Sequence, residues 1–143
     1  MNIIPHEHNT GFIDPILLKP YEPFRWWEKL KMGGTGSSKV IYHQGIEYFD
    51  EKIAQRTDLP IINFELLKKA MLIRLSIHNE CYTIAVLKQE ILEINVKSFK
   101  KDIFLLSLIL EVNLFSKVIE FEVSSGNITA IRQYFCKPYF DHL

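Results

Sequence analysis

The sequence predicts an α+β fold, with one domain built on a mainly antiparallel sheet of about six or seven strands and two or three short helices. Three successive runs of alternating apolar and polar residues lie between residues 71 and 97, and they predict a meander. Two further strand-like runs, 117–123 and 128–135, flank a Ser-Ser-Gly-Asn turn and predict a closing hairpin.

The segment 71–97 is the centre of the predicted sheet. Its three runs are separated only by Asn79-Glu80 and by residues 88–90. Because successive side chains on a strand point to opposite faces, each run presents one apolar face. We expect the inward residues to be Ile73, Leu75, Ile84, Val86, Ile94 and Val96.

Length and composition fit one soluble domain. The chain has 143 residues, 48% of them apolar, and its 17 basic residues balance 17 acidic ones. This balance provides none of the basic excess that nucleic-acid binding requires, so no nucleic-acid partner is expected. With two cysteines, no basic and apolar leader, and no apolar run of about 20 residues, the expected location is the cytoplasm.

Residues 1–23 form an extended arm. Four of the six prolines fall here, and proline disfavours both a helix interior and a central strand. The arm also carries several apolar residues, so we expect it to cover apolar surface of the domain.

Residues 23–32 predict a short amphipathic helix that holds both tryptophans. Phe24, Arg25, Trp26 and Trp27 are the candidate contact residues, because Trp beside basic residues suits a partner groove or a membrane interface. The alternative is that the tryptophans pack on the sheet.

Residues 33–39 are rich in glycine and serine. They match neither the spacing of a phosphate-binding loop nor that of a dinucleotide-binding loop, so we interpret them as a flexible linker. This divides the chain into 1–36, which holds the arm, the Trp helix and the linker, and 37–143, the sheet domain.

Between the linker and the meander we expect a hairpin and two short helices. Residues 39–49 predict a hairpin that turns near Gly45. Asp50 is placed to cap a helix over 51–56, and Asn63 to cap another over 64–70.

The apolar segment 103–115 fits a buried helix or a strand. Residues 109–114 repeat the six-residue phrase of residues 91–96, with polar positions two apart, and this spacing favours a strand. The aromatic tail after residue 135 is expected to fold back on the body. Hairpin-rich chains resemble strand-rich rolls of the pleckstrin-homology type, but those rolls close with a helix, so the predicted closing hairpin argues against that likeness.

Candidate chemistry is sparse, and no metal or cofactor is predicted. The residues that could bind a metal are His6, His8, His43, His78, His142, Cys81 and Cys136, and their spacing matches no known type of site. A small enzyme would need at least two of His78, Cys81, Glu93, Glu111 and Glu120 to converge in a pocket. Paired carboxylates from Glu93, Glu111, Glu120 and Glu122 could also line one face of the sheet.

The preferred hypothesis is a non-catalytic interaction module for an unknown protein or small-molecule partner, which makes contact through the aromatic N-terminal segment, a sheet face or both. The alternatives are the small enzyme, a peripheral membrane-associated domain and a homo-oligomerising structural protein.

Overall fold

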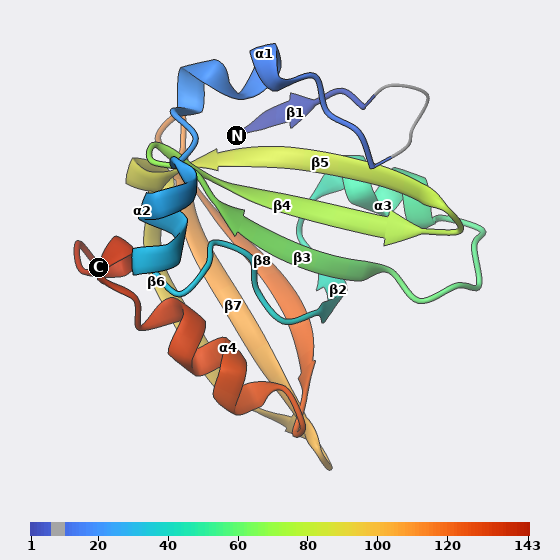
Figure 1. Cartoon of the computed structure of the whole chain (residues 1–143). Helices are drawn as coiled ribbons and strands as arrows, with labels where there is room; N and C mark the ends of the chain where they lie inside the picture. The colour runs from blue at the N-terminus through green and yellow to red at the C-terminus, as the bar shows by residue number, and fades with distance from the viewer. Residues whose placement is uncertain (7–10) are drawn as a thin grey trace.

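The computed structural model describes residues 1–6 and 11–143 (Figure 1). Its antiparallel strands form one curled sheet in the order β1-β5-β4-β3-β2-β8-β7-β6, so the predicted α+β class is confirmed with eight strands. The strands are β1 Asn2–Ile4, β2 Val40–Gln44, β3 Ile61–Leu66, β4 Ala70–Ile77, β5 Glu80–Leu87, β6 Ile91–Lys100, β7 Ile103–Val112 and β8 Phe115–Ser124. The α-helices are α1 Pro15–Leu18, α2 Trp26–Lys31, α3 Glu47–Ile53 and α4 Ile128–Phe135. Short 3-10 helices are η2 Lys19–Tyr21, η3 Lys88–Glu90 and η4 Pro138–Phe140.

The main core lies on the inner face of the curled sheet. Phe64 and Phe121 meet edge to face with their ring centroids 5.1 Å apart, and Phe49 of α3 and Ile131 of α4 are fully buried in the same cluster. These side chains exclude water from the inner face, and their burial supplies most of the hydrophobic stabilisation.

The three runs of the predicted meander do not all pair with one another. β4 and β5 form a hairpin that turns at His78 and Asn79, whose φ angles are both positive, whereas β6 pairs with β7 at the far edge of the sheet. The predicted pairing of the third run was wrong, whereas the prediction of which of its side chains face inward was correct. The predicted inward residues of the first two runs are fully buried, and Ile94 and Val96 are half-buried against the same core.

The N-terminal arm covers the outer face of β4 and β5, as expected. β1 pairs with β5, and Ile4 and Ile13 are buried against Leu72 and Ala85 in a second apolar cluster. The prediction that residues 1–23 are extended throughout was wrong at α1. Pro15 opens that helix, where a missing N–H is tolerated.

The Gly/Ser segment lies along β3. The Thr35 carbonyl accepts hydrogen bonds from the Leu66 N–H at 3.0 Å and the Tyr134 hydroxyl at 2.7 Å, and the Ser37 hydroxyl accepts one from the Phe64 N–H at 2.9 Å. These residues are therefore tied to the sheet and do not behave as a flexible linker.

The predicted hairpin over 39–49 is wrong. β2 is followed directly by α3, which also begins before the helix predicted over 51–56. Gly45 does have the positive φ expected of it (116°), but it serves a close approach to β8. A Cβ at this position would lie 2.4 Å from the Val118 carbonyl oxygen.

The predicted helix over 64–70 is also wrong. Residues 61–66 form β3, in which Ile62, Phe64 and Leu66 are buried and alternate with less buried neighbours. Asn63 could have capped a helix, but the alternation of residues 61–66 extends a strand through it, and tertiary pairing with β4 decides the outcome.

At the C-terminal end, β8 confirms the strand predicted over 117–123, and β7 confirms the one predicted over 109–114 as far as Val112, after which Asn113 and Leu114 form a turn. Residues 128–135, predicted as a strand, are the helix α4. Ile128, Ile131 and Tyr134 recur every three residues and form its buried face. The chain therefore closes with a helix, and the argument against a roll of the pleckstrin-homology type no longer holds. The tail folds back as expected, with Tyr139 and Phe140 buried.

Candidate functional site: the α2 end

The helix α2 stands at one end of the sheet, and Arg25 precedes its first turn. The Arg25 N–H donates a hydrogen bond to Glu28 Oε1 at 3.0 Å. This bond lowers the pKa of Glu28, and Lys68, whose Nζ lies 3.4 Å from Glu28 Oε2, lowers it further. The carboxylate therefore joins the start of α2 to the β3–β4 turn.

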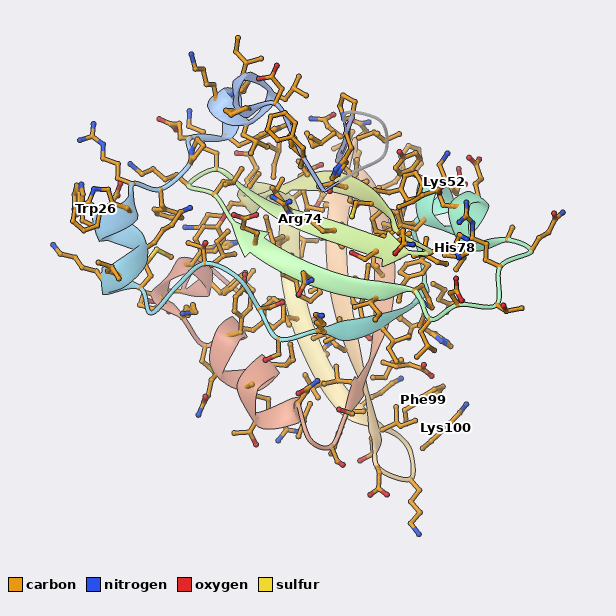
Figure 2. All side chains as sticks on the ribbon, turned by 45° about the vertical axis from the view of Figure 1, so that its right-hand side comes forward. Trp26, Lys52, Arg74, His78, Phe99 and Lys100 are labelled. Atoms are coloured by element: carbon orange, nitrogen blue, oxygen red, sulfur yellow. The ribbon has the colours of Figure 1, made fainter. Side chains whose placement is uncertain are left out.

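The two tryptophans are exposed, so the alternative in which they pack on the sheet is wrong. Trp26 is 74% exposed and Leu30, one helical turn later, is 72% exposed. Figure 2 shows Trp26 projecting outward from α2 at the margin of the molecule. Trp27 is less exposed, and its ring lies 5.3 Å from Lys31 Nζ. Of the four predicted contact residues, Phe24 instead packs against the core, beside Tyr139.

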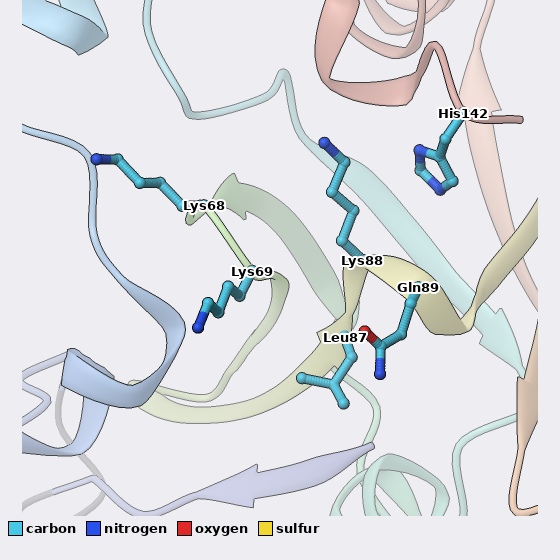
Figure 3. A pocket seen from close by; sticks show the side chains of 6 residues that line it. All are labelled: Lys68, Lys69, Leu87, Lys88, Gln89 and His142. Carbon is cyan, nitrogen blue, oxygen red and sulfur yellow. The ribbon is translucent and has the colours of Figure 1, made fainter.

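A hollow of about 630 Å³ lies beside α2 and is lined mainly by basic and apolar groups (Figure 3). Lys68 and Lys69 come from the β3–β4 turn, Lys88 and Gln89 from η3, and His142 from the tail. Lys88 Nζ lies 4.3 Å from the centroid of the Tyr139 ring. Three lysine side chains from two separate turns therefore line one depression (Figure 3).

A second hollow continues past Gln89 to the β7–β8 turn. Leu87 and Gln89 line both hollows, and Leu114 lines the second one only. Leu114 is 91% exposed, and Phe115 next to it is also well exposed. We use the term α2 end for this surface, which comprises Trp26, Trp27 and Leu30, the lysine-lined hollow, and Leu114 with Phe115.

The charge around α2 and the lysine-lined hollow is mainly positive, whereas Glu90 and Glu111 line the second hollow beside Leu114. Lys69 Nζ lies 3.0 Å from Glu22 Oε2, and Lys68 pairs with Glu28. Within the described residues, no carboxylate pairs with Arg25, Lys29 or Lys31. These three cations flank Trp26 and Leu30 on α2, although Arg25 is also close enough to Glu28 to lower the pKa of that carboxyl. An anionic surface that met the apolar side chains would therefore also meet positive charge.

The metal-binding candidates lie apart. His78 Nδ1 is 2.9 Å from Asp58 Oδ2, the His43 ring meets Phe99 edge to face, and His6 Nε2 is 2.6 Å from Thr83 Oγ1. Cys81 and Cys136 are free thiols, His142 lines the lysine hollow, and His8 lies outside the described residues. Across residues 1–6 and 11–143, no three His, Cys, Asp or Glu side chains gather in a metal-binding arrangement.

The catalytic candidates are also separated. Cys81 contacts Ser76 near the β4–β5 turn, and Glu120 on β8 accepts a hydrogen bond from Gln44. Glu93 and Glu111 line two different hollows. Glu122 follows Glu120 on the solvent-facing side of β8, whose alternate residues form the core. The structure thus brings none of these groups into a common pocket with His78.

Sequence reasoning missed Leu114 and the lysine-lined hollow. The hollow could not be foreseen, because its lysines come from two turns that meet only after the sheet has formed. Leu114 was missed because it was included in the strand predicted over 109–114, whereas the structure places Asn113 and Leu114 in the turn between β7 and β8.

The chain matches no model of a known protein family, and no curated protein matches it. Within the described residues, none of the helices has the length and apolar character needed to cross a membrane.

Proposed function

We propose that this protein is a non-catalytic interaction module that docks on anionic lipid surfaces through the α2 end. A cytoplasmic location is part of the proposal, because the cytoplasmic leaflet carries anionic lipids that attract basic surfaces. The scattering of the candidate catalytic groups supports a binding role over an enzymatic one.

The observation that carries the proposal is the pairing of protruding apolar side chains with cations. Trp26 and Leu30 project from one turn of α2, Leu114 and Phe115 from a second element, and Arg25, Lys29 and Lys31 surround the first group. Tryptophan is favoured at membrane interfaces because its ring is both apolar and able to donate a hydrogen bond. Two apolar protrusions beside a basic hollow form the arrangement that a peripheral membrane protein requires.

The backbone conformation at Leu114 also supports the proposed contact surface. Asn113 and Leu114 both have positive φ (51° and 68°), a conformation that asparagine tolerates and leucine disfavours. Leucine here contributes little packing, since its side chain is almost fully exposed. A residue that is both strained and exposed fits a role in contact with a partner surface better than a role in folding.

The expected binding energy is modest. Each lysine or arginine near an anionic surface contributes about 1 kcal/mol, and each buried apolar side chain about 1.5–3 kcal/mol. Three cations and two inserted side chains would therefore contribute roughly 6–9 kcal/mol before any entropic loss, which corresponds to weak, reversible attachment.

The test is co-sedimentation with vesicles of phosphatidylcholine alone and of phosphatidylcholine mixed equally with phosphatidylglycerol. The wild type should sediment with the mixed vesicles and much less with the neutral ones. Trp26→Ala with Leu30→Ala should remove most of this binding. Leu59→Ala is the matched control, because Leu59 is also exposed but lies in the α3–β3 loop at the opposite end of β3.

The contribution of charge is tested separately with two double variants, each of which replaces two lysines. Lys29→Glu with Lys31→Glu should weaken binding to the mixed vesicles at least tenfold, given about 1 kcal/mol for each cation lost. Lys100→Glu with Lys101→Glu changes the net charge equally at the β6–β7 turn and should have a small effect. Equal loss from both pairs, or wild-type binding after loss of Trp26 and Leu30, would contradict the proposal. The α2 end would then be a better candidate for a protein partner.

A further inference from the structure

Strand β6 forms a free edge of the sheet. It pairs with β7 on one side, and within the described residues no backbone hydrogen bond reaches its other side. Pairing shifts register at both ends of the strand and leaves the regular stretch Glu93–Ser98 between the shifts. A hollow of about 480 Å³ lies between residues 92–96 and side chains of α4 and the C-terminal tail. Such an edge is a template for another strand.

The sequence of this edge is complementary to itself. In a two-fold antiparallel pair centred on Asn95, Glu93 lies opposite Lys97 of the second copy, and this contact occurs twice. The same register places Ile94 opposite Val96 on the inner face. Opposite charges and paired aliphatic side chains both stabilise directly facing positions.

The neighbouring registers lack this match. In a two-fold antiparallel pair, directly facing residues point to the same side of the sheet. The axis must therefore pass through a residue and not between two residues, and the nearest alternative centres are Ile94 and Val96. Centring on Ile94 places Glu93 opposite Asn95, and centring on Val96 places Asn95 opposite Lys97. Each alternative leaves one charge facing an amide.

Neither charge is used within the chain. Glu93 and Lys97 face Ile109 and Leu105 on β7, and no ion pair in the described part of the chain includes either of them. Both residues are exposed on the edge strand. Two opposite, unpaired charges on a free edge match the same edge of a second copy.

We propose that β6 pairs with β6 of a second copy and joins two sheets into one across a two-fold axis at Asn95. Because the strands run antiparallel, the two α2 ends lie at opposite ends of this dimer. The interface therefore does not depend on the proposed lipid contact, and either proposal can fail without the other.

The test is the mass in solution, measured by light scattering or sedimentation equilibrium over a wide range of concentrations. Wild type should show a reversible dimer. Glu93→Lys and Lys97→Glu should each weaken dimerisation roughly tenfold or more, because each places like charges face to face twice. The exchange variant that carries both substitutions should restore it, since the pairs are then re-formed with reversed sign. Lys101→Glu is the control outside the paired stretch.

A crosslink provides a second readout. With Cys136→Ser as background, Asn95→Cys should form an intermolecular disulfide under mild oxidation, because the axis brings the two copies of residue 95 within disulfide reach. A monomeric wild type at every concentration, an exchange variant that stays as weak as the single variants, or no crosslink at residue 95 would each overturn the proposal.

Discussion

The two halves of the sheet share one sequence pattern but differ in what covers them. In the half formed by β3, β4 and β5, the inner face packs in the core and the arm covers the outer face of β4 and β5, so Leu72 and Ala85 are fully buried. In the half formed by β6, β7 and β8, the outer face is more open, because Val118 is about half exposed there although Leu105 is buried. Alternation sets which residues point together, and the remaining chain decides which face meets water.

The open half contributes less to the core and more exposed apolar surface than the covered half. The covered half holds most of the fully buried side chains, whereas the open half contributes both Leu114 and the free β6 edge.

The largest effect is expected at the junction, where β2 meets β8. Gly45→Ala should destabilise the protein by about 4 kcal/mol or prevent folding, because its Cβ would overlap the Val118 carbonyl and φ is positive. Gly126→Ala is the control, since a Cβ there meets only the Ser124 hydroxyl at 3.9 Å. Chemical denaturation of both variants gives the two free energies. Similar stabilities for the two variants would mean that β2 does not approach β8 as described.

The contrast between the halves predicts unequal truncation costs. Leu72→Ala should lower the free energy of unfolding by about 2–5 kcal/mol, because it opens a cavity under the arm. Val118→Ala, on the open face, should cost about 0.5 kcal/mol. Equal costs in urea denaturation would show that the arm does not cover β4.

Alkaline pH should destabilise the fold through its buried phenols. Burial and a hydrogen bond to Glu80 raise the pKa of Tyr82 to about 12, and burial also raises the pKa of Tyr42 and Tyr134. A folded pKa above the unfolded value contributes stability that is complete below about pH 10 and is lost as pH rises toward about 12. Denaturation at several pH values measures the slope, and Tyr82→Phe should reduce it. A flat profile across this range would contradict the burial of these phenols.

The only expected gain in stability is at Leu114, and it is small. Leu114→Gly should raise the free energy of unfolding by about 1 kcal/mol, because glycine accepts the positive φ without strain. The same variant should bind mixed vesicles more weakly, since an exposed apolar side chain is lost. Thermal unfolding and co-sedimentation on one preparation measure both changes. A variant that gains stability and keeps full binding would remove Leu114 from the proposed contact surface.

The fold class and most strands could be predicted because alternation is local. Residues 73, 75, 84 and 86 face inward as that pattern requires. The errors arose where a local signal competed with tertiary pairing, as with Asn63, whose capping preference gave way to strand pairing with β4. Residues 128–135 were predicted as a hairpin strand from their place after the Ser-Ser-Gly-Asn turn, although Ile128, Ile131 and Tyr134 have helical spacing.

The candidate site was predicted only in part. Trp26 and Trp27 were correctly placed on a short helix, which Arg25 precedes, but composition could not decide whether the rings faced the sheet or solvent. Phe24 shows the limit of such reasoning, because it lies two residues from Trp26 and packs on the core. The lysine-lined hollow depends on contacts between turns far apart in the chain.

Tryptophan fluorescence tests the central claim most directly, because Trp26 and Trp27 are the two tryptophans of the chain. The account predicts emission typical of solvent-exposed indole, quenched readily by acrylamide, which shifts to shorter wavelength and becomes protected when phosphatidylglycerol vesicles are added. Protected, short-wavelength emission without vesicles would place the rings in the core, and exposed emission unchanged by the vesicles would exclude the α2 end as a lipid contact.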